Sequence, residues 1–299
     1  MGLPVTIPML NNCDIKVLHI EPTDVCQAAC PLCARETNKL FNKKHQNHLS
    51  MDQILKIINP EQIAALDKMF MCGNYGDPAA GKNTIDIYQK FRSINPTITL
   101  GMNTNGALQN SKWWTQLAEI FNQLKDYVVF SIDGLEDTNH IYRRDVSWKK
   151  LLKNVKTFID AGGSAHWDML VYQHNEHQVE QCQQLAKDLG FKWFRAKVSN
   201  RPTTDKIKLP TSWQMPKSEF GSIDCRAINE KSIYIDSTGQ LRPCCWFGID
   251  RTHNITLVSQ VADTWNTPNP HTVCKRSCST LESGNTVYQN QFRIEKKLC

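Results

Sequence analysis

Short apolar runs alternate with stretches of helical periodicity along the first two thirds of the chain. The runs predict six β-strands, at Val17–Ile20, Lys68–Cys72, Ile98–Met102, Tyr127–Ile132, Ala165–Val171 and Trp193–Val198. Apolar residues recur at helical spacing over residues 148–159, before Gly162, and over residues 179–189, before Gly190. The alternation predicts an α/β fold with a parallel sheet. Periodicity leaves open whether the sheet is doubly wound or a partial barrel.

Four segments of unusual composition directly follow, or end, the first four predicted strands. They are residues 26–33 with three cysteines, Gly73–Pro78, Asn103–Gly106 and Ser131–Gly134. In both candidate architectures the carboxyl ends of parallel strands carry the functional groups. We therefore expect these four segments to lie together on one rim of the sheet.

The pattern changes after Val198. Residues 199–224 are polar and contain Pro202, Pro210 and Pro216, which is typical of a linker. A hairpin-like stretch follows, with Ser232–Ile235, a turn at Asp236–Gly239, and Leu241–Cys245. We expect an N-terminal extension over 1–14, an α/β domain over 15–205 and a small cysteine-rich domain over 206–299.

Composition is that of a globular protein, with 40% hydrophobic and 21% charged residues among 299. No apolar run approaches the roughly 20 residues of a membrane helix, and the N-terminus lacks the features of a secretory signal. We therefore predict a cytoplasmic protein without membrane contact. The net charge of +6 is mild, so nucleic-acid binding is not indicated. One basic stretch would suit either an anionic substrate or a solvated face: Lys192, Arg195, Lys197, Arg201, Lys206 and Lys208.

The twelve cysteines are clustered, which in a cytoplasmic protein indicates metal ligands rather than disulfides. Cys26, Cys30 and Cys33 lie within eight residues, close enough for one loop to wrap an iron–sulfur cluster. Three thiolates on a four-iron cube leave one iron open for catalysis. Zinc is the alternative, although it prefers four ligands, which His45 or His48 would have to complete.

The spacing Cys26-x-x-x-Cys30-x-x-Cys33 after the first strand resembles the signature of the radical S-adenosylmethionine (SAM) superfamily. The resemblance implies a partial (β/α)6 TIM-like barrel and a SAM-binding [4Fe-4S] cluster. It also implies an enzyme that cleaves SAM reductively, with an electron donor such as flavodoxin or ferredoxin as partner. The 5′-deoxyadenosyl radical so formed abstracts hydrogen from a substrate C–H bond.

Further segments match the family in chain order. Gly76-Asp77-Pro78 resembles its Gly-Gly-Glu-Pro segment, with Asp77 where Glu is commoner, and Thr104-Asn105-Gly106 resembles its third-strand turn. Leu32 stands where an aromatic residue often packs on adenine. The resemblance implies SAM contacts from Gly76, Asp77, Pro78, Asn103, Thr104, Ser131, Asp133, Arg143 or Arg144, and Leu170.

The second cysteine set resembles the SPASM or twitch extension of these enzymes, which carries auxiliary iron–sulfur clusters. Only five cysteines are present, so we expect one auxiliary [4Fe-4S] cluster on Cys225, Cys244, Cys274 and Cys278, with Cys245 in reserve. A zinc knuckle is the alternative. In sulfatase-maturing relatives an Asp that acts as a base follows the cysteine equivalent to Cys244. Cys245 stands there instead, which argues against that activity.

The leading functional hypothesis is radical chemistry on a peptide or protein residue, because SPASM-type relatives mostly act on peptides. The alternatives are a nucleotide, sugar or other small metabolite as substrate, or a non-catalytic electron carrier or zinc-binding module. Among the remaining side chains we expect Cys182 to be packed core and a reactive role to be open to Cys72. His166, His174 and His177 would either donate protons or be structural.

Overall fold

One sheet runs through the part of the chain that the structure describes. The computed structural model describes residues 15–39, 41–199, 201, 203–211, 213, 221–249, 259–281, 286 and 292–298. The expected N-terminal extension over 1–14 lies outside the described residues, as do Pro202 and Pro216 of the expected linker. The sheet has nine strands in the order β8-β7-β1-β2-β3-β4-β5-β6-β9.

Strands β1 to β6 are the six that the sequence predicts. Their bounds are β1 Val17–Ile20, β2 Lys68–Met71, β3 Thr99–Thr104, β4 Tyr127–Ser131, β5 Ala165–Val171 and β6 Trp193–Val198. Each pairs in parallel with the next. Their order follows the chain without the reversal that a doubly wound sheet has at its switch point. This mostly parallel α/β sheet is consistent with the radical SAM partial barrel.

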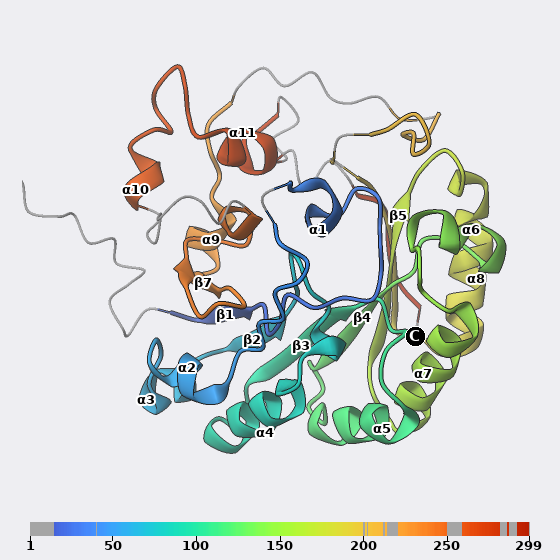
Figure 1. Ribbon diagram of the computed structural model, residues 1–299, viewed down its shortest axis with the longest axis horizontal. Coiled ribbons are helices and arrows are strands. Elements are labelled where there is room, and N and C mark those ends of the chain that lie inside the picture. The colour runs from blue at the N-terminus through green and yellow to red at the C-terminus, as the bar shows by residue number, and fades with distance from the viewer. Residues whose placement is uncertain are drawn as a thin grey trace, which may run out of the picture.

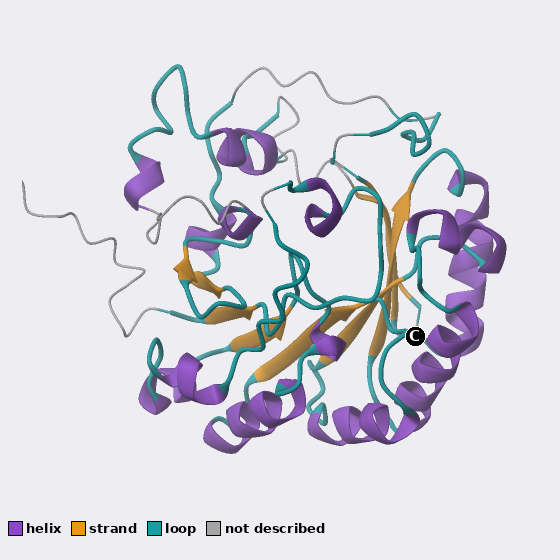
Figure 2. Ribbon diagram, in the orientation of Figure 1, coloured by secondary structure: helices purple, strands orange, loops and turns teal. Residues whose placement is uncertain are grey.

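Helices cover the outer face of this sheet, as Figures 1 and 2 show. They are α2 Met51–Leu55, α3 Pro60–Ala64, α4 Thr84–Ile94, α5 Ser111–Ile120, α6 Glu136–Tyr142, α7 Trp148–Asp160 and α8 Val179–Leu189. The two helices that the periodicity predicts are α7 and α8. Ser147 caps α7 by accepting a hydrogen bond from the backbone of Lys150, and Gly190 ends α8 with a φ of 88°, a left-handed conformation that suits glycine.

The two faces of the strands differ in chemistry. On β5 and β6 the outward residues Trp167, Phe194 and Ala196 are fully buried against the helices. The alternate residues face the inside of the curved sheet, where Arg195 Nε donates to Asp168 at 2.9 Å. The side chains of the predicted basic stretch therefore do not form one surface. Lys192, Lys206 and Lys208 are exposed, whereas Arg195 and Lys197 lie beside Asp168.

The segment after the expected boundary extends both edges of the same sheet. Strand β7 (Ser232–Ile235) pairs in parallel with β1, β8 (Leu241–Arg242) pairs antiparallel with β7, and β9 (Phe292–Lys297) pairs antiparallel with β6. The hairpin-like stretch of the sequence is thus β7 and β8. Its neighbours α9 (Arg226–Asn229), α10 (Ser259–Ala262) and α11 (Thr272–Cys278) group beyond the β7 end of the sheet (Figure 1). The boundary near residue 205 stays a prediction.

A second, small hydrophobic core forms among these C-terminal helices. It consists of Ala227, Phe247, Val261 and Cys274, with Cys225, Cys244 and Trp265 packed against it. The large core lies between the sheet and helices α2–α8. Among the described helices, none has the length and apolar character that crossing a membrane requires.

Candidate active site

The loop after β1 carries the first three cysteines, and buried polar side chains hold it in place. Glu21 is fully buried, and its Oε1 accepts hydrogen bonds from the backbone N–H groups of Asn74 and Tyr75, both at 2.7 Å. Its Oε2 accepts from the Tyr234 hydroxyl on β7 at 2.9 Å. One carboxylate therefore joins the cysteine loop, the loop after β2 and strand β7.

Gly76 lets the loop after β2 pack directly on the cysteine loop. A Cβ atom at Gly76 would lie 2.0 Å from the carbonyl oxygen of Thr23 and 2.9 Å from Cα of Asp24. The Asp77 N–H donates to the Val25 carbonyl at 2.9 Å. These backbone contacts explain a glycine at this position.

Asp77 is buried and fixes the end of the third strand. Its Oδ1 accepts from the Thr104 hydroxyl at 2.7 Å and from the Ala79 N–H at 2.9 Å. Its Oδ2 accepts from the backbone N–H and from the side-chain Nδ2 of Asn105, both at 2.7 Å. Burial raises the pKa of Asp77, and the hydrogen bonds from Asn105, Thr104 and Ala79 oppose that effect. Pro78 begins a short 3₁₀ helix, η2 (Pro78–Ala80), which Asp77 caps.

The three thiols face a shared environment formed by these loops. The Cys26 sulfur accepts from the Ala28 N–H at 3.4 Å and lies 3.7 Å from Asn105 Nδ2, while Cys33 Sγ lies 3.7 Å from the Asn74 carbonyl. Cys30 is buried, and Cys33 precedes α1 (Ala34–Thr37). Burial raises the pKa of Cys26 and raises that of Cys30 to about 11. Among the described residues no three His, Cys, Asp or Glu side chains are grouped as ligands of a metal ion.

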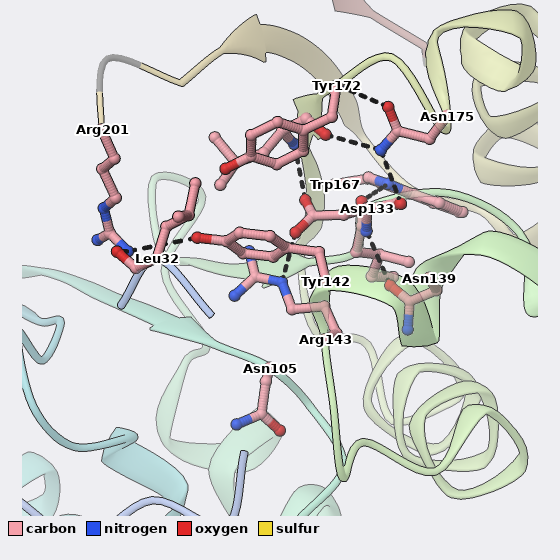
Figure 3. A network of polar contacts seen from close by, with 12 residues as sticks. Leu32, Asn105, Asp133, Asn139, Tyr142, Arg143, Trp167, Tyr172, Asn175 and Arg201 are labelled. Atoms are coloured by element: carbon pink, nitrogen blue, oxygen red, sulfur yellow. Dashed lines mark hydrogen bonds and ion pairs between the residues drawn. The ribbon is translucent and has the colours of Figure 1, made fainter. Parts of the chain in front are cut away.

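Asp133, which follows β4, is the third buried carboxylate that holds the rim together (Figure 3). Its Oδ1 accepts from the Leu170 N–H at 2.7 Å, and its Oδ2 pairs with Arg143 Nε at 2.6 Å. Its backbone N–H donates to Asn139 and its carbonyl accepts from Asn175. The predicted residues Asp133, Arg143 and Leu170 are therefore in direct contact.

Two arginines approach the cysteine loop. The Arg143 charge acts on Cys30 to lower its pKa against the larger effect of burial, and Arg201 acts in the same direction. The Arg144 side chain is exposed, and only its carbonyl contacts the loop, accepting from Ala29 at 3.1 Å. Of the two arginines proposed for a SAM carboxylate, Arg143 is the one beside the site.

The remaining predicted side chains lie near the rim without a hydrogen bond to another described residue. Asn103 on β3 and Ser131 at the end of β4 are both partly buried on the inner face. Tyr142 stacks on Tyr172 with ring centroids 4.9 Å apart, next to Asp133 and Arg143 (Figure 3). This aromatic pair, like Glu21 and Asn175, is absent from the sequence prediction because nothing in its local pattern distinguishes it from core residues.

The second cysteine set lies at the small core and beside the loop after β2. Cys225 and Cys244 pack with Cys274 against the small core, and Cys225 and Cys274 both act electrostatically on Cys278. The Cys245 carbonyl accepts from Asn74 Nδ2 at 2.7 Å, and the Cys245 thiol acts electrostatically on Cys72. Charge effects also link Cys245 to Cys244 and Cys278, so the structure does not set the reserve cysteine apart, and the choice of ligands among the five stays a prediction.

The isolated thiols and histidines are mostly enclosed. Cys182 is buried in the large core, as expected. Burial raises the pKa of Cys72 to about 12, so its thiol stays protonated at neutral pH. His166 stacks on Tyr127 at 5.2 Å, and burial lowers its pKa to about 4. His174 stacks on Tyr172, and its two ring nitrogens are buried without a hydrogen-bond partner among the described residues.

The chemistry of the three-cysteine site fits a cluster with an open iron. The donors close to the thiols are amide N–H groups and guanidinium cations, which stabilise thiolates and an anionic cluster. The buried acids nearby, Asp77 and Asp133, are already engaged by hydrogen bonds or by an arginine. The first loop therefore offers three sulfur donors, with the positive charges of Arg143 and Arg201 near Cys30 and the negative charge of Asp77 near Cys26.

Comparison with known proteins agrees with this geometry. The family model of the radical SAM superfamily matches residues 20–188. A GTP 3′,8-cyclase of Desulforamulus reducens is 25% identical over 128 residues, covering 42% of this chain and 36% of the cyclase. The fold is similar to that of Streptococcus suis SuiB bound to the precursor peptide SuiA, with a TM-score of 0.58 and 15% identity over 85% of this chain and 65% of SuiB. It is also similar to anSMEcpe with bound AdoMet and a peptide, with a TM-score of 0.55 and 15% identity over 76% and 73% of the two chains.

Coverage of these relatives is incomplete. The matched region spans about a third of the cyclase and just under two thirds of SuiB. At 15% identity the structural likenesses establish the fold.

Proposed function

Because the chain belongs to the radical SAM superfamily and is a radical SAM enzyme, we propose that it uses a 5′-deoxyadenosyl radical to abstract hydrogen from a C–H bond of a peptide or protein residue. One observation carries the proposal. Hydrogen bonds join the loops after β1, β2 and β3, the segment after β4 contacts the first loop through the Arg144 carbonyl, and that first loop carries the three thiols. We take the fold to be a partial (β/α)6 barrel with a SPASM- or twitch-like C-terminal region.

The three thiols would hold the SAM-binding [4Fe-4S] cluster. When bound and reduced, this cluster supplies the electron that cleaves SAM into methionine and the 5′-deoxyadenosyl radical. Cys26, Cys30 and Cys33 provide the thiolates, and Asn105 donates towards the Cys26 sulfur. Arg143 and Arg201 place positive charge near the same loop, which lowers the cost of keeping several thiolates in a buried position.

The SAM molecule would lie against the rim between the second and fifth strands. We propose that Arg143 meets the SAM carboxylate while Asp133 fixes its guanidinium and the backbone at Leu170. Asp77 already accepts four hydrogen bonds, so we assign it the ordering of Thr104 and Asn105. The backbone of the Gly76–Pro78 segment then remains to meet the SAM amino group. Asn103 and Ser131 would contribute from the inner face.

The second cysteine set would bind one auxiliary [4Fe-4S] cluster through Cys225, Cys244, Cys274 and Cys278. The shared small core supports this set, since Cys225, Cys244 and Cys274 all pack there. The matched pair Cys244→Ala and Cys245→Ala tests the assignment by anaerobic iron and sulfide quantitation. We expect about eight irons in the wild type and in Cys245→Ala, and about four in Cys244→Ala. Zinc in this set, or equal losses in the two variants, would contradict the assignment.

Two substrate classes have support, and the peptide class has more. SuiB and anSMEcpe are similar over three quarters or more of this chain, and their structures contain peptides. A nucleotide is the second candidate, favoured by the similarity to a GTP cyclase over 128 residues. The non-catalytic alternatives, an electron carrier or a zinc-binding module, are not supported by membership of this enzyme superfamily.

The test is formation of 5′-deoxyadenosine by the reduced, reconstituted enzyme. Dithionite, or a flavodoxin or ferredoxin system, supplies the electron, and a peptide pool and a nucleotide mixture are offered separately. We expect 5′-deoxyadenosine to increase with the peptide pool and to vanish in Cys26→Ala, Cys30→Ala and Cys33→Ala. If 5′-deoxyadenosine increases only with the nucleotide mixture, the substrate is a nucleotide and the peptide assignment is wrong. Reconstituted wild type that never cleaves SAM would refute the function.

A further inference from the structure

Arg201 links the far end of the sheet to the three-cysteine loop. It follows β6 by three residues, and its Nη1 donates to the Leu32 carbonyl at 3.0 Å and lies 3.4 Å from the Tyr142 hydroxyl. Leu32 stands between Cys30 and Cys33, and its carbonyl belongs to the peptide bond of Cys33. The guanidinium therefore contacts the backbone that presents two of the three thiols (Figure 3).

The charge of Arg201 is not balanced in the way that the charge of Arg143 is. Arg143 has an ion pair with Asp133 at 2.6 Å, whereas no carboxylate in the described part of the chain pairs with Arg201. Burial acts to lower the pKa of Arg201, but Tyr142 and Cys33 outweigh it, so the pKa lies above its usual value. Burial lowers the pKa of Arg276 on α11, and the charge of Arg201 lowers it further. A partly buried cation beside two other cations is favourable only where anions accumulate.

The three-cysteine loop is where negative charge would accumulate and then increase. Three thiolates give a four-iron cluster a net negative charge, and reduction adds one more electron. A fixed cation interacts more strongly with the reduced form than with the oxidised form, because the attraction grows with the charge of the partner. Arg201 suits this role because it contacts the loop and no carboxylate of the described residues pairs with it.

We propose that Arg201 is a positioning residue that raises the reduction potential of the cluster on Cys26, Cys30 and Cys33. The proposal rests on the proposed function, since it requires that the loop bind this cluster. The guanidinium acts on the cluster through the Leu32–Cys33 peptide and through its charge, and it does not touch the reacting atoms.

The test is a redox titration of the holoenzyme without SAM or substrate, followed by EPR of the signal that Cys26→Ala removes. In Arg201→Gln we expect about a tenfold smaller ratio of reduced to oxidised cluster at a fixed potential, a shift of about 59 mV for a one-electron couple. Arg201→Lys keeps the charge and is expected to stay close to the wild type. Lys192→Gln makes the same change in net charge at an exposed position directly before β6 and should leave the potential unchanged.

Further controls separate charge from loss of the cluster. Each titration is normalised to its own fully reduced signal, so partial iron loading does not affect the potential. Arg201→His, titrated at pH 6 and pH 8.5 beside the wild type, should show a lower potential at the higher pH, where imidazole is neutral. Equal potentials in Arg201→Gln and Lys192→Gln, or an equal fall in Arg201→Lys and Arg201→Gln, would overturn the inference while leaving the proposed function intact. Wild type without a reducible cluster would overturn the proposed function itself.

Discussion

Replacing Gly76 by alanine tests whether close contact between the first two rim loops is needed for function. The added Cβ atom would lie 2.0 Å from the Thr23 carbonyl oxygen, 2.6 Å from its carbonyl carbon and 2.9 Å from Cα of Asp24. All three are backbone atoms, so rotation of a side chain cannot relieve the overlap. The two loops must move apart.

The size of that movement follows from the contact distance. Ordinary van der Waals contact for a Cβ begins near 3.4 Å, so the loops must separate by about 1.4 Å. Overpacking of this kind costs about 1–3 kcal/mol in stability. A displacement of about 1 Å between reacting groups lowers rates about 100-fold. We therefore expect Gly76→Ala to lose more activity than its loss of stability explains.

The assay compares Gly76→Ala with Gly163→Ala. A Cβ at Gly163 would lie 2.4 Å from the Phe158 ring, a similar overlap at the end of α7, on the opposite side of the sheet from the rim. Both variants should show a lower melting temperature. Only Gly76→Ala should show a large fall in iron content or in 5′-deoxyadenosine formation at a temperature where both are folded. Wild-type iron content and activity in folded Gly76→Ala would refute the argument that this contact positions the cysteines.

Three further predictions concern buried polar groups. Asp133→Asn leaves the Arg143 charge without its partner Asp133, so we expect the free energy of unfolding of the apoprotein to fall by about 3 kcal/mol. We also expect weaker SAM binding by calorimetry. Unchanged values in both measurements would contradict the importance of the ion pair. Burial, with Lys68 adding to it, lowers the pKa of His19 to about 4, so the folded state binds fewer protons than the unfolded state between pH 6.5 and pH 4. The wild type should therefore lose about 2 kcal/mol more than His19→Gln between pH 7 and pH 5 in denaturant titrations, and parallel curves would refute this. Asn105→Ala removes the donor to Asp77 and Cys26 and should lower iron retention under a chelator challenge, whereas wild-type retention would show that the contact has no such role.

The strands and the rim were predictable because their signals are local. The short apolar runs locate β1, β5 and β6 with the bounds that the structure has. Chain-order alternation of strands and helices predicts a parallel sheet, and parallel strands bring their carboxyl ends to the same edge. The contact of Asp133 with Arg143 could be expected only from family resemblance, since ten residues separate them in sequence.

The C-terminal segment shows what local signals miss. The sequence predicts a separate small domain, but it contains no information on the partner of Ser232–Ile235. In the structure this strand pairs with β1, and Tyr234 donates to Glu21 across 213 positions. This pairing includes a hydrogen bond to a buried carboxylate that is distant in sequence. The apolar pattern of a four-residue strand does not specify which strand it will pair with.

The buried polar side chains of the rim connect neighbouring loops in the order of the strands. Glu21, after β1, accepts from the loop after β2. Asp77, after β2, accepts from the turn after β3. Asp133, after β4, accepts from the end of β5. These acids bind backbone N–H groups of adjacent loops, so they serve to fix the loops rather than to transfer protons.

Arg201 completes this arrangement with a donor in place of an acceptor. It follows β6 and donates to the carbonyl of Leu32 in the loop after β1, so it joins the last parallel strand to the first loop. The parallel strands β1 and β6 do not pair with each other. Instead, β1 pairs with β7 and β6 pairs with β9. The contact from Arg201 therefore supplies a tie across the opening. Because no carboxylate among the described residues pairs with this guanidinium, the proposed role of Arg201 would couple the closure of the rim to negative charge on the cysteine loop.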